Sequence, residues 1–462
     1  MALNRRNFLK QLSALSLIGT QSGLGGTALS ALAADHSGYK ALVCVFLFGG
    51  LDNHDVLIPY DPAEYNEYAN RRSSLLGLHG ASRARESLLP LVPQGTSTPT
   101  KNWALPPELP SVKTLFDSGE ASLIANVGPL IEPVTRQSFL DQSVRLPPRL
   151  FSHNDQQATW QASAPEGAQF GWGGLFADAL LSESASADTL AFSTISSVGG
   201  GPFLTGRRAF PYLVSGGRAA DIFLLDELDD DQSNLGAHLE RHFKGDNYSG
   251  SHLLRRDLQN SYRNALETNA AYNAAQLGAP ELATAFPQTG LGSQLRGVAN
   301  SISIRNQLSV SRQVFFVGIG GFDTHDNQAG SLPQLLSELD GAIGAFAEAM
   351  RELGQHSNVT LFTASDFGRT LAVNGDGTDH GWGGHQLVVG GAVAGRQIIG
   401  TPTPPVFDHD LDAGGGRIIP TLSVEQFAAP LGSWFGLSNE ELAFALPSLG
   451  NFDSAGLDLF AS

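Results

Sequence analysis

The chain has 462 residues, of which 42% are hydrophobic and 16% are charged, and its formal net charge at pH 7 is −17. This composition is typical of a globular protein, because disordered chains lack the apolar residues that form a core. The excess of acidic residues argues against a nucleic-acid-binding protein, which needs clustered Lys and Arg to neutralise phosphates. Since Cys44 is the single cysteine, an intramolecular disulfide and a cysteine-based zinc site are both excluded.

The N-terminal residues have the pattern of an export signal. Residues 4–10 contain two adjacent arginines followed by Phe-Leu-Lys, and a mildly apolar segment with a small-x-small cleavage site covers residues 12–33. This pattern resembles the twin-arginine signal and predicts a signal peptide over residues 1–34, with an ordinary amphipathic helix as the alternative. The resemblance implies the twin-arginine export machinery as a partner and a periplasmic or secreted protein. No later run of 18 apolar residues follows, so no stable membrane span is expected.

Four continuous apolar runs predict strands of a central sheet. A run without alternation is typical of a strand that is buried on both faces of a parallel sheet. The runs cover residues 40–48, 121–127, 314–319 and 359–363. Between the last two, residues 332–353 have apolar side chains at helical spacing. The strand–helix–strand order predicts a right-handed crossover in an α/β fold with a mostly parallel central sheet flanked by helices.

Two parts of the chain differ from this pattern. Residues from about 235 to 312 are polar and helix-prone, with helices expected over 253–277 and 291–308 and no strand. Residues 75–102 are rich in Ser, Pro, Thr and Gly and are expected to form a loop. We therefore predict one main α/β domain over residues 35–462 with a helical insertion at about 235–312.

Acidic and histidine residues follow the predicted strands at four places. Open parallel sheets bind their ligands beyond the carboxyl ends of the strands, so these residues are expected to lie close together. The four groups are Asp52 with His54 and Asp55, Asp323 with His325 and Asp326, Asp366 with Arg369, and Asp379 with His380 and His385. Carboxylate and imidazole without thiolate suit Zn, Mn or Fe, and Mg or Ca where only oxygens contribute. Two such ions would polarise an ester oxygen and activate a nucleophile.

Each group has a simpler explanation when it is taken alone. An Asp after a strand, such as Asp52 or Asp366, is often a helix cap or a turn residue. The glycines around His380 and His385 suit a tight turn as well as a bend around an ion. The metal prediction therefore depends on the combination of the four groups.

A further candidate is the segment Ser-His-Asn-Asp at residues 152–155. Two prolines precede it, and Ser152 with Asp155 three residues later resembles a variant capping box, which predicts that a helix starts at Ser152. The same position at a helix N-terminus favours an anion, so the Ser152 hydroxyl is also a candidate nucleophile, activated by a metal ion or by His153. The two interpretations are compatible.

Together these motifs resemble the domain-of-unknown-function family 1501. The resemblance rests on the twin-arginine leader, Phe-Gly-Gly-Leu-Asp, Ser-His-Asn-Asp-Gln-Gln, Gly-Phe-Asp-Thr-His-Asp-Asn-Gln, Ser-Asp-Phe-Gly-Arg-Thr and Gly-Thr-Asp-His-Gly-Trp-Gly-Gly-His, and it extends over about residues 5–453. This family is grouped with the alkaline phosphatase and sulfatase superfamily. The resemblance therefore implies an alkaline phosphatase-like fold and a metal site.

The superfamily pattern also implies roles for single residues. Ser152 takes the place of the nucleophile, and the implied metal ligands are Asp52, Asp323, His325, Asp366, His380 and His385.

Three positions depart from the superfamily pattern. Asp323 and His325 are separated by one residue, where related phosphatases have a wider gap. Phe367 occupies the place of the histidine in an Asp-His pair, so one ion loses a ligand or takes His153 instead. Asp366 stands where the family usually has glutamate. A mononuclear site and an inactive relative therefore both stay open.

Two functions follow from these residues. The first is an exported, metal-dependent hydrolase of phosphate or sulfate esters, with a small-molecule or polymer substrate that is attacked by Ser152 or a metal-bound water. Here Arg369 either pairs with the substrate oxyanion or forms a salt bridge with a nearby carboxylate. The second is a non-catalytic periplasmic or surface protein that binds a polymer or a protein partner. Either protein would hold one or two divalent ions, with Zn, Mn, Mg and Ca not distinguished.

Overall fold

A computed structural model describes residues 38–94, 101–181, 186–219, 237–238, 241, 253–453 and 457–461. The chain divides into two units, Met1–Ala33 and Ala34–Ser462, and all described residues belong to the second unit. The predicted signal peptide over residues 1–34 therefore lies outside the described residues. None of the helices in the described part of the chain is long and apolar enough to cross a membrane.

The first apolar run of the sequence forms the middle strand of the main sheet. β1 (Lys40–Leu47) is buried from Ala41 onward and pairs in parallel with β9 (Arg312–Ile319) on one side and with β10 (Val359–Ser365) on the other. This arrangement explains the continuous apolar sequence, because neither face of β1 meets solvent. Leu47 lies opposite the last residues of both neighbours, so the three strands end together at one edge.

The sheet continues beyond β10 with a change of direction. β13 (Gly384–Val389) pairs antiparallel with β10 and with β5 (Ala121–Gly128). β14 (Ile398–Gly400) and β15 (Leu422–Ser423) are both parallel to β5. The sheet is therefore mixed, because β13 runs against its neighbours.

On the other side of β9 the sheet ends in three short strands. β6 (Thr194–Ser196) is parallel to β9, β7 (Tyr212–Ser215) is parallel to β6, and β8 (Arg218–Ala219) is antiparallel to β7. Two small sheets lie outside this main sheet. One consists of β2 (Ile58–Pro59), β4 (Trp103–Leu105) and β3 (Leu89–Pro90), and the other consists of β11 (Arg369–Val373) and β12 (Thr378–His380). The predicted α/β class with a mostly parallel sheet is confirmed.

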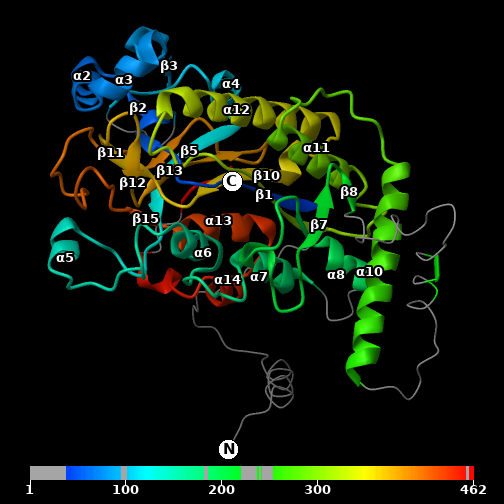
Figure 1. Ribbon diagram of the computed structural model, residues 1–462. Helices are drawn as coiled ribbons and strands as arrows, with labels where there is room; N and C mark the ends of the chain where they lie inside the picture. Colours follow the sequence, from blue (N-terminus) through cyan, green and yellow to red (C-terminus); the bar gives the residue numbers. More distant parts are fainter. Residues whose placement is uncertain are drawn as a thin grey trace, which may run out of the picture. The chain divides into compact units, whose positions relative to one another are not determined.

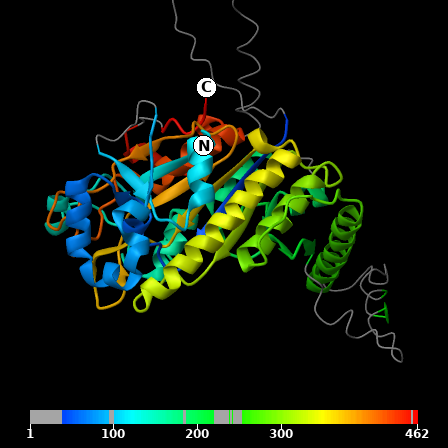
Figure 2. The same cartoon turned by 90° about the horizontal axis from the view of Figure 1, so that it is seen from above.

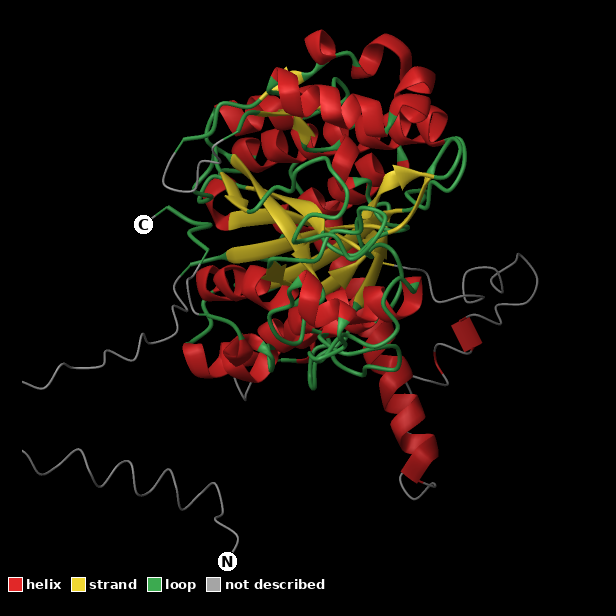
Figure 3. Ribbon diagram, turned by 90° about the vertical axis from the view of Figure 1, so that its left-hand side faces the viewer, coloured by secondary structure: helices red, strands yellow, loops and turns green. Residues whose placement is uncertain are grey.

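Helices cover both faces of the main sheet, as Figure 3 shows. One face packs against α4 (Pro110–Asp117), α11 (Gly290–Ser303) and α12 (Gln328–Glu352), and α12 lies along the strands (Figure 2). The opposite face packs against α6 (His153–Ala162), α7 (Trp172–Leu180), α13 (Val424–Phe435) and α14 (Asn439–Ala445) (Figure 1). The remaining helices are α2 (Pro62–Arg71), α3 (Ser73–His79), α5 (Arg136–Leu140), α8 (Ala187–Phe192) and α10 (Leu253–Leu277).

The helices predicted for the middle of the chain are present. α10 has the predicted bounds and lies at the β8 edge of the sheet, where the buried Tyr272 ring packs against Phe192 and Tyr212. α11 begins at Gly290 and ends at Ser303, five residues earlier than predicted. The interpretation of this stretch as an insertion stays a prediction.

The prediction of a loop over residues 75–102 is wrong for most of residues 75–90. α3 and β3 occupy it together with two short 3-10 helices. Leu75, Leu88 and Leu91 are buried there, although small and polar residues dominate the local sequence. Packing of these few leucines on the rest of the chain therefore outweighs the local preference for irregular structure.

Candidate metal centre

A glycine lets the segments that follow β1 and β9 approach each other closely at the edge of the sheet where β1, β9 and β10 end. Gly49 follows β1 with a φ of +116°, a conformation that an L side chain rarely adopts. A Cβ atom at this position would lie 2.3 Å from the backbone nitrogen of Asp323. The segment after β1 can therefore approach the segment after β9 only because residue 49 has no side chain.

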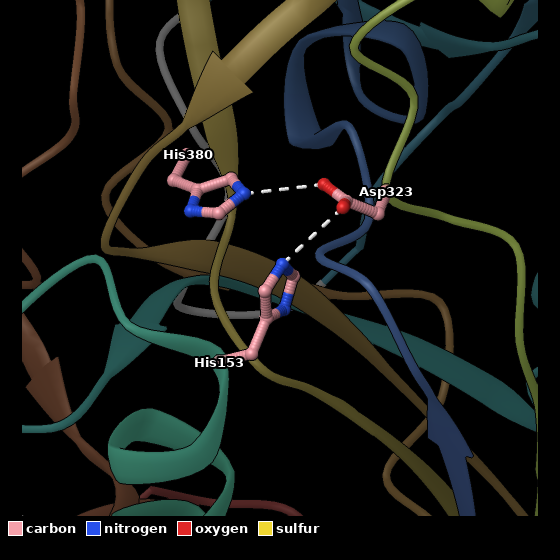
Figure 4. A group of neighbouring side chains, drawn as sticks. All are labelled: His153, Asp323 and His380. Carbon is pink, nitrogen blue, oxygen red and sulfur yellow. Dashed lines mark hydrogen bonds and ion pairs between the residues drawn. The ribbon is translucent and has the colours of Figure 1, made fainter.

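Three predicted site residues converge at this edge of the sheet. His153 lies at the start of α6, Asp323 follows β9, and His380 ends β12. The Nε2 atoms of His153 and His380 point toward Asp323 from two sides, at 3.4 Å from its Oδ2 and 3.2 Å from its Oδ1 (Figure 4). One donor atom from each of the three residues lies within 4.8 Å of the others, and no other group of this kind exists among the described residues.

Each histidine of this group is fixed through its other ring nitrogen. His153 Nδ1 is 2.6 Å from Asp366 Oδ2, and His380 Nδ1 donates to the carbonyl oxygen of Phe151 at 2.8 Å. Asp366 is fully buried and its Oδ2 also accepts from Gln157 Nε2 at 2.8 Å. A carboxylate or carbonyl behind the second ring nitrogen is the usual support of a metal-binding histidine, because it directs the free Nε2 lone pair toward the ion.

His325 is a third imidazole, and it lies beside this group. Its Nε2 atom lies 2.9 Å from His380 Nε2 and 3.1 Å from Asp323 Oδ1, while its Nδ1 is 3.3 Å from Asp379 Oδ1. Two imidazole nitrogens at this distance repel each other unless they share a proton or a cation. The side chains of His325 and Asp323 are 42% and 43% exposed, so solvent reaches this part of the group.

Arg369 completes the surroundings of Asp323. Its side chain is fully buried, and its Nη1 donates to Asp323 Oδ1 at 2.7 Å and to the carbonyl oxygen of Gly49 at 3.1 Å. Its Nε and Nη2 atoms donate to the Oγ1 and the carbonyl oxygen of Thr378. Of the two roles considered for Arg369, the salt bridge to a nearby carboxylate is therefore the one that its contacts satisfy.

The electrostatic setting keeps the acidic group charged. Burial raises the pKa of Asp323, but the hydrogen bond and charge of Arg369 outweigh it and hold that pKa below its ordinary value of 3.8. The hydrogen bond to Asp366 raises the pKa of His153, whereas burial lowers the pKa of His380. An anionic carboxylate beside two oriented imidazoles is a donor set that attracts a divalent cation.

Four of the six predicted ligands lie outside this group: His325 is beside it, Asp366 supports His153, and the other two have partners elsewhere. Asp52 is fully buried against Arg72 and Gln328, behind Arg369. His385 is buried inside β13, where its Nδ1 accepts the backbone N–H of Asn126 at 3.0 Å and its ring lines an apolar cavity. In the glycine-rich segment, His380 ends β12 and His385 lies in β13, and only residues 381–383 between them are loop.

Ser152 is the residue before α6, as predicted, but its hydroxyl does not cap the helix. Instead its Oγ donates to Asp155 Oδ2 at 3.0 Å. Among the described residues, the partner of this hydroxyl is therefore Asp155, and none of His153, Asp323 and His380 is hydrogen-bonded to it. The helix start was therefore predicted correctly, while the nucleophile role stays a prediction.

The sequence analysis did not predict three residues that support the site, and the sequence contains a signal for only one of them. Phe151 contributes only a carbonyl group, which its unusual φ of +71° turns toward His380. Gln157 lies one helical turn after His153, and this spacing on one face of a helix could have identified it. Arg72 comes from a distant helix end, and nothing in its own segment indicates its partner.

The burial of His385 leads to a prediction about stability and pH. Burial lowers the pKa of His385 from 6.5 to about 4, so the folded chain binds a proton here less readily than the unfolded chain. The contribution of His385 to the free energy of unfolding is therefore fully present above pH 6.5. It is lost as the pH falls toward 4, which lowers the free energy of unfolding by about 3 kcal/mol. We expect His385→Asn to have a shallower loss of stability between pH 7 and pH 4 in urea unfolding. Parallel curves for both proteins would contradict this.

The family model described as protein of unknown function (DUF1501) matches residues 39–413. Because the match covers most of the chain, the chain belongs to this family, as its motifs indicate. No curated protein matches the chain.

Several solved structures align with most of the chain. The structure of Ps i-CgsB in complex with k-i-k-neocarrahexaose has 12% identity, covers 90% of this chain and 77% of that chain, and gives a TM-score of 0.33. The PsFucS1 sulfatase from Pseudoalteromonas sp. has 10% identity, with 88% and 72% covered and a TM-score of 0.35. The lipoteichoic acid synthase LtaP from Listeria monocytogenes has 8% identity, with 83% and 71% covered and a TM-score of 0.31.

Proposed function

We propose that this protein is an exported, metal-dependent hydrolase of phosphate or sulfate esters. The observation that carries the proposal is the convergence of His153, Asp323 and His380, whose donor atoms lie within 4.8 Å of one another. Both imidazoles are already oriented by hydrogen bonds through Nδ1, which is an arrangement that metal binding requires and that packing alone does not.

The donor set favours a zinc-like ion over calcium or magnesium. Two imidazole nitrogens and one carboxylate suit Zn, Mn or Fe, whereas Ca and Mg prefer oxygen ligands. His325 is near enough to act as a fourth ligand. When bound, such an ion lowers the pKa of a coordinated water and polarises an ester oxygen.

Other residues of the chain orient the side chains that would bind the ion. Arg369 holds Asp323 in place from the buried side. Asp366 holds His153 with its Nε2 toward the site, and Phe151 does the same for His380. Asp379 lies 3.3 Å from His325 Nδ1 and holds that imidazole with its Nε2 toward the group in the same way.

The leader over residues 1–34 is proposed to direct export by the twin-arginine route. A chain that folds in the cytosol before export can acquire its ion there, and a single buried cysteine is compatible with folding in a reducing compartment. Replacement of both leader arginines by lysine is the direct test, because it would leave the protein inside the cell.

Metal content and ester hydrolysis together test the proposed function. The purified protein, expressed in metal-replete medium, is expected to contain Zn, Mn or Fe and to hydrolyse aryl phosphate monoesters, aryl phosphate diesters or aryl sulfates. Chelation should abolish this turnover, and addition of the ion should restore it. A protein that neither contains nor takes up a divalent ion would contradict the proposal.

Ser152→Ala decides between the two candidate nucleophiles. Because the Ser152 hydroxyl donates to Asp155, we expect the variant to keep its metal and to lose no more than about tenfold in kcat. Asn154→Ala, at an exposed position in the first turn of α6 and two residues after Ser152, is the matched control. A fall of several orders of magnitude in Ser152→Ala alone would make the hydroxyl the nucleophile.

One observation favours the alternative, a non-catalytic metal protein. The Ser152 hydroxyl and the Arg369 guanidinium are both engaged with protein groups, so neither is free for a substrate in this arrangement. Such a protein would bind a divalent ion but hydrolyse none of the esters. Binding of the ion with a rise in melting temperature and no turnover would support this function.

A further inference from the structure

Asp52 is a predicted metal ligand whose two carboxylate oxygens both have donors from the protein. Its Oδ1 accepts the backbone N–H of His54 at 3.1 Å. Its Oδ2 lies 2.7 Å from Arg72 Nη1 and accepts from Gln328 Nε2 at 2.5 Å. Both oxygens are therefore occupied by donors, and the side chain is fully buried.

Arg72 is not a surface cation that a metal ion could displace. Its side chain is fully buried, and it donates through Nε to the carbonyl oxygen of Leu371 and through Nη2 to that of Thr370. Moving this guanidinium away would remove a donor from two carbonyl groups and leave the Asp52 carboxylate buried without its cation, which is a large cost. The positive charge beside Asp52 is therefore built into the fold.

Gln328 joins Asp52 to the support of the metal centre. Its Oε1 accepts from Thr378 Oγ1 at 2.8 Å, and Thr378 Oγ1 in turn accepts from Arg369 Nε at 3.3 Å. Asp52 is thus connected to Arg369, and through it to Asp323, by a chain of buried hydrogen bonds.

The other residues that a second ion would need are also committed. Asp366 Oδ2 is held by His153 and Gln157, and the Phe367 ring lies 4.9 Å from the His153 ring where a further imidazole would be required. Asp366 Oδ1 has no partner, but it is a single buried oxygen. One oxygen cannot replace the three or more ligands of a divalent ion.

We propose that the site binds one divalent ion and that the buried Arg72 guanidinium, and not a second ion, neutralises the Asp52 carboxylate. The proposal rests on the proposed function, since it concerns the number of ions at that same site. It makes Arg72 a permanent substitute for a metal charge, and it removes Asp52 from the ligand set.

Metal stoichiometry tests the proposal without any assay of activity. The full mature protein is loaded with excess Zn²⁺, freed of unbound metal by gel filtration, and measured by mass spectrometry of the metal. We expect one ion per chain in the wild type and in Asp52→Asn. Two ions in the wild type, falling to one in Asp52→Asn, would overturn the proposal. No bound ion in the wild type would contradict the proposed function itself.

Mn²⁺ provides a second measurement that does not depend on the variant. One bound Mn²⁺ per chain gives the six-line electron paramagnetic resonance signal of an isolated ion, whereas two ions a few ångströms apart give a broadened, coupled signal. We expect the isolated signal at every loading. If Asp52→Asn does not fold, Asp52→Asn with Arg72→Gln removes both charges of the pair and takes its place. A coupled signal in the wild type would overturn the proposal.

Discussion

Asp323→Ala is expected to purify without a metal ion and to show no measurable ester hydrolysis. Asp323 is the carboxylate between the Nε2 atoms of His153 and His380, and both of its oxygens face this group. Loss of a residue that only supports a ligand costs about 10- to 100-fold in metal affinity, so loss of a ligand should cost more than about 100-fold. Competition with a zinc-binding dye measures this affinity, and mass spectrometry measures the metal content.

Asp326→Asn is the matched control for this variant. Asp326 lies in the same loop, is exposed, and is outside the group of converging donor atoms. Because it removes the same charge from the same segment, any effect of net charge alone would appear in both variants. Full metal content in Asp323→Ala would contradict the assignment of the site, as would equal losses in the two variants.

The sequence patterns predicted those parts of the fold in which local sequence and burial agree. β1 is an apolar run because both of its neighbours are parallel strands, and the bounds of α10 follow directly from its composition. The antiparallel direction of β13 could not be predicted, because a short apolar run has the same sequence pattern in a parallel and in an antiparallel strand. The structure of residues 75–94 was missed because three buried leucines determine it.

The candidate site was predicted where its residues follow strands that end together. Asp323 and Asp366 were predicted in this way, whereas His380 was predicted from its glycine-rich surroundings and lies in β12, outside the main sheet. His153 was named as a replacement for the missing histidine at Phe367. The sequence could not separate ligands from their supports. That difference depends on which donor faces each carboxylate, and the partners come from distant segments: Asp366 meets His153 across 213 positions, and Asp52 meets Gln328 across 276.

Arg83→Met is expected to cause the largest loss of stability among substitutions away from the metal centre. Arg83 is fully buried and makes two 2.7 Å hydrogen bonds to Asp55, through Nε and Nη2. Its Nη1 contacts both carboxylate oxygens of Glu108 at 3.0 and 2.9 Å. Removal of the guanidinium leaves the Asp55 carboxylate buried without a cation, which costs about 3–5 kcal/mol.

Urea unfolding of Arg83→Met and of Arg145→Met measures this effect against a surface pair. The Arg145 side chain is 67% exposed and lies 3.2 Å from Glu132, so its removal should change the free energy of unfolding by less than about 1 kcal/mol. Asp55→Asn combined with Arg83→Met should recover part of the loss, because the unpaired charge is then absent. Equal effects of the two single substitutions would mean that water reaches Asp55 and that this pair does not hold the segment after β1 in place.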